Sequence, residues 1–392
     1  MMIFKRIFLI VLDSFGIGAE PDANEFGDAD TVNTLKSVMT SDKLNIPNMK
    51  KLGLFNIDGV EDGEKEPNPD ASFARLQEAS KGKDTTIGHW EIAGIVSDTP
   101  LPTYPDGFPK DIIEKLEAAF GRKIICNQPY SGTQVIHDYG KEHMETGALI
   151  VYTSADSVLQ IAAHEAVVPV EQLYEYCKEA RKIMSGEHSV GRIIARPFVG
   201  EFPDFERTPR RHDYSMEPPG DTILDLLKVA GNSVVSIGKI NDIFAGRGIS
   251  RHIAITSNED GMEKAIAELD RNYYGLCFVN LVDFDMKYGH RRDVDGYAAA
   301  LTRFDEQLGE FLPKMKRGDV LIITADHGCD PRGAGTDHTR EYVPMMIYGE
   351  GIKKGVDLGT RHSFADIAAT VSKIMRIPYA TRGQSFWNEV KE

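Results

Sequence analysis

The sequence predicts an α/β fold in which a doubly wound, mainly parallel sheet is interrupted by a smaller inserted α/β domain. Short apolar runs without polar alternation recur along the chain, and such runs are typical of strands buried on both faces. Segments with apolar residues at helical spacing separate these runs, and strands that alternate with helices form doubly wound sheets. Two proline-rich segments indicate where the inserted domain begins and ends.

The strands expected in the core share this uninterrupted apolar character. They are RIFLIVL (6–12), SVVSIG (233–238), LCFVNLV (276–282), DVLIITA (319–325) and VPMMIYG (343–349). The helices expected between and after them cover 220–231, 260–272, 293–317 and 363–375. In the long segment 293–317, apolar residues recur every three or four positions, which predicts an amphipathic helix.

The sequence pattern in the middle of the chain predicts a separate cap domain. It begins with the proline-rich segment TPLPTYPDGFP and ends with FPDFERTPRRHDYSMEPPG. Between them KIIC, ALIVYTS and RIIARPFVG have the composition of strands. We therefore expect a core domain formed by residues 1–99 and 218–392, and an inserted cap domain at 100–217.

Composition excludes several classes of function. The 392 residues carry a net charge of −15, which argues against binding to nucleic acid or to anionic membranes. No apolar run approaches the roughly 20 residues of a membrane-spanning helix. The four cysteines are widely spaced and form no CxxC motif, as is typical of a reducing compartment. We expect a cytoplasmic protein with small-molecule partners, and nothing indicates an obligate protein partner.

Acidic and histidine residues follow several of the expected strands. Because the carboxyl ends of parallel strands meet at one edge of the sheet, we expect these side chains to converge. They are Asp13, Asp283, Asp285, His290, Asp326, His327 and His338. Clustered carboxylates repel one another unless a cation neutralises them, and mixed Asp and His donors suit Mn²⁺, Zn²⁺ or Mg²⁺. Two such ions can clamp the oxygens of a phosphoryl transfer; the alternative is a set of unrelated helix caps and core histidines.

The stretch KDTTIGHWE (83–91) places two threonines beside this predicted site. One interpretation is a surface turn followed by a helix that Thr85 or Thr86 caps. The other is that one hydroxyl is the nucleophile of a two-metal site, and Thr86 then caps the turn or bonds a nearby backbone group. His89 either orients this loop or satisfies a backbone carbonyl.

Five motifs together resemble the alkaline phosphatase superfamily and, within it, the phosphopentomutase family. They are LDSFGIG, KDTTIGHWE, NLVDFDMKYGHRRD, TADHGCDP and GTDHTREYVP, and the resemblance covers the whole chain. It implies an alkaline phosphatase-like core and two metal sites. One site is implied to use Asp13, Thr85, Asp326 and His327, and the other Asp285, His290 and His338. Ile87 and Cys329 stand where the family implies Thr and Asn, outside these ligand sets.

The resemblance also implies the reaction. A phosphoryl group moves between C1 and C5 of ribose or 2-deoxyribose through a phosphothreonine at Thr85 and a bound 1,5-bisphosphate. Two Mn²⁺ ions per chain are implied, although the donors alone do not separate Mn²⁺ from Mg²⁺ or Zn²⁺. Ribose 1,5-bisphosphate or glucose 1,6-bisphosphate is the implied activator. We expect Asp283 to be a partner of a ligand histidine and not a ligand itself.

Candidate substrate-binding residues lie mainly in the cap domain. Ser154 and Asp156 can bond sugar hydroxyls, and an arginine fork suits a phosphate held away from the metals. Among the arginines of 191–214 we favour Arg192 and Arg210, and Lys239 lies just beyond the cap domain.

Three other functions are considered. A cofactor-independent phosphoglycerate mutase shares the two-metal core, but it usually has a longer chain and a serine nucleophile. A phosphatase passes the phosphoryl group to water, and a sulfatase needs a modified Cys or Ser that Thr85 does not provide. A non-catalytic metal-binding or sugar-sensing protein has no need of a nucleophile beside its ligands.

Overall fold

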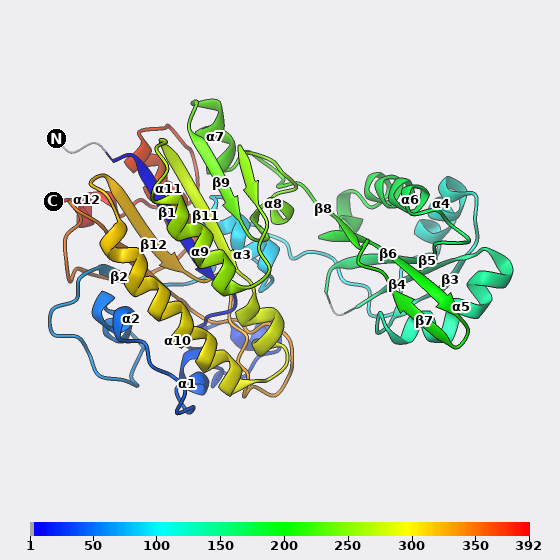
Figure 1. The fold of residues 1–392 in the computed structure, drawn as a ribbon, viewed down its shortest axis with the longest axis horizontal. Coiled ribbons are helices and arrows are strands. Elements are labelled where there is room, and N and C mark those ends of the chain that lie inside the picture. Colours follow the sequence, from blue (N-terminus) through cyan, green and yellow to red (C-terminus); the bar gives the residue numbers. More distant parts are fainter. Residues whose placement is uncertain (1–3, 155) are drawn as a thin grey trace. The chain divides into compact units, whose positions relative to one another are not determined.

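The computed structural model describes residues 4–154 and 156–392 (Figure 1). Contacts within the chain divide it into two compact units. The core unit comprises the residues up to Thr99 together with Pro218–Glu392, and the inserted unit is Pro100–Glu217. The chain thus leaves the core unit once and returns to it once, with a proline at each crossing.

The core unit is built on an eight-stranded sheet in the order β10-β9-β11-β1-β12-β13-β2-β14. Its strands are β1 (Arg6–Leu12), β2 (Ser72–Leu76), β9 (Ser233–Ile237), β10 (Arg251–Ile253), β11 (Gly275–Leu281), β12 (Asp319–Thr324), β13 (Val343–Tyr348) and β14 (Asp357–Arg361). The five strands from β10 to β12 are parallel, whereas β13 is antiparallel to both of its neighbours. This mainly parallel α/β sheet confirms the predicted fold class.

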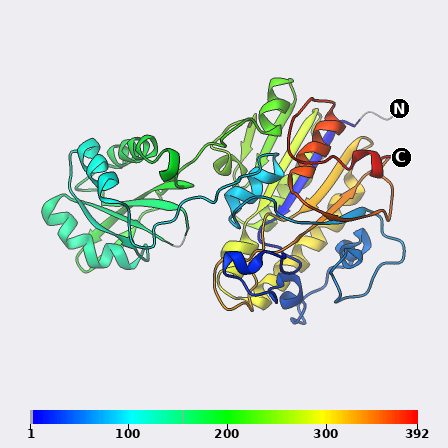
Figure 2. The ribbon, with the colours of Figure 1, turned by 180° about the vertical axis from the view of Figure 1, so that it is seen from behind.

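The central strands are buried along their whole length because helices cover both faces of the sheet. Every residue of β1, β11 and β12 is buried. Helices α9 (Asn258–Glu268) and α10 (Val294–Phe311) pack together on one face. On the other face, α11 (Ala365–Met375) packs against α3 (Thr85–Ile92) and α7 (Ile223–Val229), as the view from behind shows (Figure 2). The remaining helices of this unit are α1 (Thr34–Val38), α2 (Pro47–Leu52), α8 (Ile240–Ile243) and α12 (Trp387–Val390).

The predicted helices form, but their ends differ for local reasons. The segment 293–317 is α-helical only to Phe311, because Pro313 has no backbone N–H and the chain tightens into a 3-10 turn at Leu312–Lys314. Helix α9 begins at Asn258, earlier than expected. Ser257 is its N-cap, and the Ser257 side chain accepts a hydrogen bond from the backbone N–H of Asp260. No helix in the described part of the chain is long and apolar enough to cross a membrane.

The inserted unit has its own sheet and its own hydrophobic cores. Strands β3 (Ile124–Pro129), β4 (Leu149–Thr153), β5 (Val158–His164), β6 (Arg192–Glu201) and β7 (Asp204–Arg207) pair in this order, and β8 (His212–Ser215) pairs with β6. Helices α4 (Lys110–Phe120) and α6 (Val170–Ile183) share one apolar cluster with the sheet. Helix α5 (Gln134–Thr146) shares the other. Successive residues of β4, such as Ile150 and Val151, enter opposite clusters, because side chains along a strand point alternately to its two faces.

Candidate metal centre

The candidate centre lies at one edge of the core sheet. Strands β11, β1 and β12 are neighbours and run parallel, so their carboxyl ends meet at this edge. Asp13 follows β1 directly, and Asp326 and His327 follow β12. After β11 the chain turns through a π-helical segment, Phe284–Gly289, which carries Asp285 and leads to His290. Segments far apart in sequence thus deliver acidic and imidazole groups to one place.

The first group of side chains contains Asp13, Asp326 and His327, which offer ligand atoms within 4.8 Å of one another. The Nε2 atom of His327 lies 3.3 Å from Asp326 Oδ2 and 3.5 Å from Asp13 Oδ1. Thr85 Oγ1 is 3.1 Å from the same nitrogen. The other ring nitrogen, Nδ1, lies 3.0 Å from the carbonyl oxygen of Gly328 and donates to it, which leaves Nε2 with its lone pair.

The second group contains Asp285, His290 and His338. The Nε2 atoms of the two histidines are 3.1 Å apart, and each lies 3.3 Å from one oxygen of Asp285. His290 Nδ1 donates to the carbonyl oxygen of Thr336 at 2.6 Å, so its Nε2 also has a free lone pair. The ring of His338 stacks on that of His327, with centroids 4.0 Å apart. The two groups therefore adjoin.

Unsatisfied carboxylate oxygens show that these residues fit metal ions. Asp13 Oδ1, Asp285 Oδ1 and Asp326 Oδ2 are buried and accept no hydrogen bond from the described residues. Burial, followed by the charges of Asp326 and Asp285, raises the pKa of Asp13 to about 7. Burial opposes ionisation of Asp285 too, but the imidazoles of His338 and His290 hold its pKa well below its usual range. Buried charge without a partner is costly, and divalent cations remove that cost.

The stretch that contains the two threonines begins helix α3 at Thr85. Asp84 is the N-cap, and its side chain accepts from the backbone N–H groups of Thr86 at 3.0 Å and Ile87 at 3.1 Å. The expectation that a threonine caps this turn was therefore wrong, because the carboxylate one residue earlier already takes both amide protons. The hydroxyl of Thr85 lies in the first group of side chains.

Comparison with known proteins identifies the family. A family model described as the Metalloenzyme superfamily matches residues 5–379. A phosphopentomutase from Lachnoclostridium phytofermentans is 58% identical, over 98% of this chain and 99% of its own. Another from Caldanaerobacter subterraneus subsp. tengcongensis is 52% identical, over 98% of each chain. This chain belongs to the phosphopentomutase family. It is therefore a member of a family of metal-dependent enzymes.

One solved structure has a fold similar to that of this chain. The PH0037 protein from Pyrococcus horikoshii is similar with a TM-score of 0.50 over 97% of this chain and 99% of that one. Because the two sequences are only 14% identical, this likeness shows the fold alone. The phosphopentomutase relatives match at both ends of the chain and through the inserted unit.

In this member of the phosphopentomutase family, His89 contacts both the first turn of α3 and the Asp326 carboxylate. Helix α3 lies directly on the end of β12, because a Cβ atom at Gly88 would be only 2.2 Å from the carbonyl oxygen of Asp326. His89 Nδ1 lies 2.8 Å from the carbonyl oxygen of Thr85 and 3.1 Å from Asp326 Oδ2. Burial alone would lower the pKa of His89, but the Asp326 carboxylate raises it above its ordinary value.

We predict that His89→Gln lowers kcat by about 10- to 100-fold, the range found when a partner that orients a metal ligand is removed. The loss follows because the imidazole bridges Thr85 and Asp326, and glutamine lacks the rigid ring that fixes both. His252→Gln is the matched control, because His252 is exposed on β10 and contacts Ser236. Equal kcat values for the two variants would show that His89 only packs.

Sequence reasoning missed the residues that hold the carboxylates in place. Asn280, a buried amide in the apolar strand β11, donates to Asp13 Oδ2 at 2.7 Å. The backbone N–H of Ser14 donates to Asp326 Oδ1 at 3.1 Å, and Ser14 itself has a left-handed φ of 70°. Its hydroxyl lies 3.2 Å from that of Tyr297. A lone amide in an otherwise apolar strand was a usable signal for Asn280, whereas no local pattern identifies Ser14.

Asp283 does not serve a ligand histidine, contrary to expectation. Its Oδ2 accepts from the backbone N–H of Asn258 at 2.9 Å and from Lys287 Nζ at 3.1 Å. Its own backbone N–H donates to Asn258 Oδ1. The side chain therefore ties the end of β11 to the first turn of α9.

The candidate substrate-binding residues do not form one cluster. Arg192 Nη2 lies 3.4 Å from Asp156 Oδ2, and Ser154 Oγ accepts from the Asp156 backbone N–H at 3.3 Å. Arg210 instead forms an ion pair with Glu165, just beyond the opposite end of β5. The side chains of Arg192 and Arg210 are therefore engaged near opposite ends of β5, a strand of seven residues that spans about 20 Å. Lys239 belongs to the core unit, where it precedes α8.

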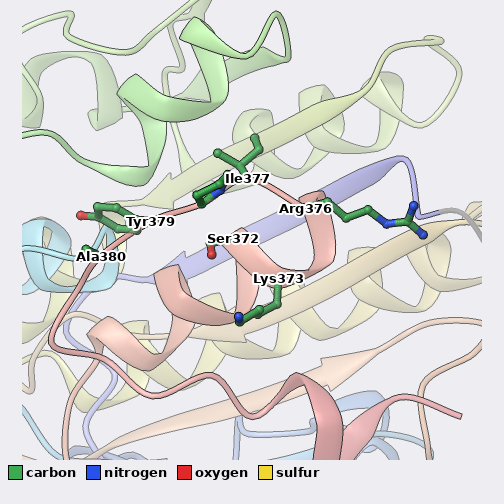
Figure 3. Close-up of a pocket in the computed structure, with 7 residues that line it drawn as sticks. Ser372, Lys373, Arg376, Ile377, Tyr379 and Ala380 are labelled. Carbon is green, nitrogen blue, oxygen red and sulfur yellow. The ribbon is translucent and has the colours of Figure 1, made fainter.

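A separate pocket lies at the end of α11 (Figure 3). It is lined by Ser372, Lys373, Arg376, Ile377, Pro378, Tyr379 and Ala380. None of these residues belongs to either group of the candidate centre. The metal-binding edge of the sheet, and not this pocket, therefore carries the groups that phosphoryl chemistry needs.

Proposed function

We propose that this chain interconverts the 1-phosphate and 5-phosphate of ribose or 2-deoxyribose, with Thr85 as the residue that carries the phosphoryl group. One observation supports this role most strongly: Thr85 Oγ1 lies 3.1 Å from His327 Nε2, among the carboxylates of the first group. The names of the full-length relatives support the substrate class. Thr85 is half-buried at the first position of helix α3, and the N-terminus of a helix favours a phosphate group.

Two divalent ions would be held by the adjoining groups. Asp13, Thr85, Asp326 and His327 would hold one, and Asp285, His290 and His338 the other. Bound ions supply positive charge for the phosphoryl oxygens and for the attacking and leaving oxygens. Mn²⁺ is the ion we propose at the first site, because its donors are mainly oxygens.

The chain's own residues support two successive transfers. In the first, the free sugar hydroxyl forms a bond to phosphorus as the bond to Thr85 Oγ1 breaks, and the hydroxyl proton ends on Thr85. The bound 1,5-bisphosphate then reorients in the site. Thr85 Oγ1 forms a bond to the other phosphorus as the bond from that phosphorus to the sugar oxygen breaks, and the proton returns to the sugar oxygen. His89 holds the Thr85 carbonyl throughout, so the hydroxyl keeps its position. A trace of ribose 1,5-bisphosphate or glucose 1,6-bisphosphate would load Thr85 at the start.

In the inserted unit, Arg192 is the proposed phosphate contact, with Ser154 and Asp156 bonding the sugar hydroxyls. We predict that Arg192→Ala raises KM by about 10- to 100-fold, the loss expected for a hydrogen bond to a charged group. Arg210→Ala is the control, because Arg210 is engaged with Glu165 at the other end of β5. Loading of Thr85 by a bisphosphate is measured in both variants. A larger KM effect in Arg210→Ala would reverse the assignment.

The proposed partners are small sugar phosphates, and the proposed location is the cytoplasm. All four cysteines lie among the described residues and are free thiols, which supports a reducing compartment.

The direct test is an assay of the full chain with ribose 1-phosphate, Mn²⁺ and a trace of glucose 1,6-bisphosphate. Phosphorus NMR distinguishes the products, and we expect ribose 5-phosphate. Inorganic phosphate as the main product would indicate a phosphatase, in which water replaces the sugar hydroxyl. Conversion of 3-phosphoglycerate in a parallel sample, without conversion of ribose 1-phosphate, would indicate a cofactor-independent phosphoglycerate mutase instead.

A further inference from the structure

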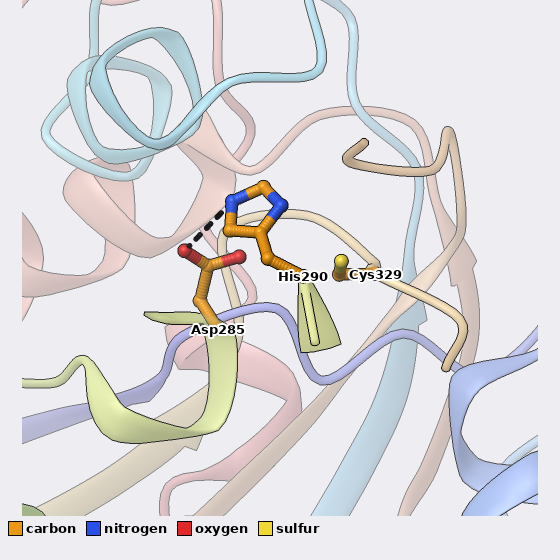
Figure 4. A group of neighbouring side chains, drawn as sticks. All are labelled: Asp285, His290 and Cys329. Carbon is orange, nitrogen blue, oxygen red and sulfur yellow. Dashed lines mark ion pairs between the residues drawn. The ribbon is translucent and has the colours of Figure 1, made fainter. Parts of the chain in front are cut away.

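A cysteine stands beside the second group of candidate metal ligands. One ligand atom each from Asp285, His290 and Cys329 lies within 4.8 Å of the other two (Figure 4). Cys329 comes two residues after His327 and is only 1% exposed. A Cβ atom at Gly289 would be 2.9 Å from Cys329 Sγ, so the thiol is packed against the segment that carries His290.

A second observation points to a ligand at this place. Asp285 is 7% exposed, and its Oδ1 accepts no hydrogen bond from residues 4–154 or 156–392. His290 uses Nδ1 to donate to Thr336 O, so its Nε2 lone pair faces the Asp285 carboxylate. The thiol of Cys329 lies 3.5 Å from the carbonyl oxygen of Asp337, which is a weak hydrogen bond. An oxygen, a nitrogen and a sulfur atom, each of a type that binds metal ions, thus lie close together, and the Asp285 Oδ1 atom beside them has no hydrogen-bond partner among the described residues.

We propose that Cys329 is an additional ligand in the second metal site, which then has Asp285, His290, His338 and Cys329 as donors. The inference rests on the metal centre proposed above. The Sγ–metal bond forms as the thiol releases its proton to solvent. Four mixed N, O and S donors suit tetrahedral Zn²⁺ or Co²⁺, and a thiolate disfavours Mn²⁺ relative to these ions.

A thiolate ligand at the second site would make the two sites prefer different metal ions. The first group offers only oxygen atoms and one imidazole nitrogen, which suit Mn²⁺ or Mg²⁺. With a thiolate, the second site takes the softer ion whenever both kinds are present. This chain would therefore hold a mixed pair of ions, with Cys329 as the residue that determines the choice at the second site.

The test uses the full chain, stripped of metal and loaded with Co²⁺. We expect a thiolate-to-cobalt charge-transfer band in the near ultraviolet, which Cys329→Ser removes and Cys126→Ser keeps. Cys126 is the matched control, because it lies in the inserted unit and is half-buried. In competition with Mn²⁺, we expect Cys329→Ser to lose about 10-fold or more of its affinity for one of two Zn²⁺ ions.

X-ray absorption of the Zn²⁺-loaded wild-type chain decides the question even if Cys329→Ser does not fold. We expect a sulfur neighbour at about 2.3 Å, distinct from nitrogen and oxygen at about 2.0–2.1 Å. Two ions per chain with no sulfur neighbour and no charge-transfer band would overturn the role of Cys329 and leave the proposed function intact. Failure to bind any ion would overturn both.

Discussion

Thr85→Ala abolishes isomerisation, with an expected loss on the order of 10⁴-fold or more, whereas Thr86→Ala retains most of the activity. The two hydroxyls are adjacent in sequence but differ in surroundings. Thr85 Oγ1 lies 3.1 Å from His327 Nε2, among the candidate ligands. The backbone of Thr86 is held by the Asp84 carboxylate in the first turn of α3. We therefore expect the hydroxyl of Thr85, and not that of Thr86, to meet both the metal-binding groups and an incoming phosphate.

The rate of ribose 1-phosphate conversion measures this difference. Thr85→Ser serves as the conservative variant: it keeps the hydroxyl but loses the β-branch that restricts its rotamer, so we expect partial activity. Metal-activated hydrolysis of substrate by Thr85→Ala is compatible with the proposed role, provided that no phosphate returns to the other carbon. Isomerisation by Thr85→Ala at a rate close to that of the parent chain would overturn the role of this residue.

Asp285 and His338 are both candidate ligands of the second group, and we expect the removal of either side chain to reduce metal binding to a similar extent. We predict that Asp285→Ala and His338→Ala each reduce the metal content from two ions to about one, and lower activity by about 100-fold or more. Both side chains lie beyond strand ends, and the apolar strands β11 and β12 fold without them. Each variant removes one donor of the second group and so weakens the binding of an ion there.

Metal content by mass spectrometry checks this prediction, with thermal unfolding as the test of fold. Asp270→Ala and His252→Ala are controls, because both residues are exposed and belong to neither group. We expect both controls to bind two ions and to keep full activity. Two ions per chain and full activity in Asp285→Ala or His338→Ala would remove these residues from the ligand set.

The sheet and its helices were predictable because their signal is local. The uninterrupted apolar runs at 6–12 and 319–325 are buried strands, and the helical stripe of 293–317 is α10. The convergence of Asp13 and Asp326 also followed from the sequence, because parallel strands deliver their carboxyl ends to one edge. These inferences needed periodicity and topology alone.

Residues whose partners are distant in sequence were not predictable in the same way. Asp283 and Asp285 are two positions apart, yet the π-helical turn at Phe284–Gly289 sends one to α9 and the other to the metal centre. Likewise, Arg192 and Arg210 lie in the two basic stretches 191–198 and 206–214, but the antiparallel return of the chain through β7 and β8 leaves Arg210 with Glu165. Only the folded chain distinguishes the members of such pairs.

The most direct test of the central role of Thr85 is to locate the phosphoryl group on the enzyme. The chain is incubated with labelled glucose 1,6-bisphosphate and Mn²⁺, digested with trypsin, and the peptide between Lys83 and Lys110 is fragmented in a mass spectrometer. This peptide contains both Thr85 and Thr86, so one spectrum compares them. We predict label on Thr85 and none on Thr86. Label on Thr86, or an unlabelled peptide from an enzyme that isomerises ribose 1-phosphate, would contradict the proposed mechanism.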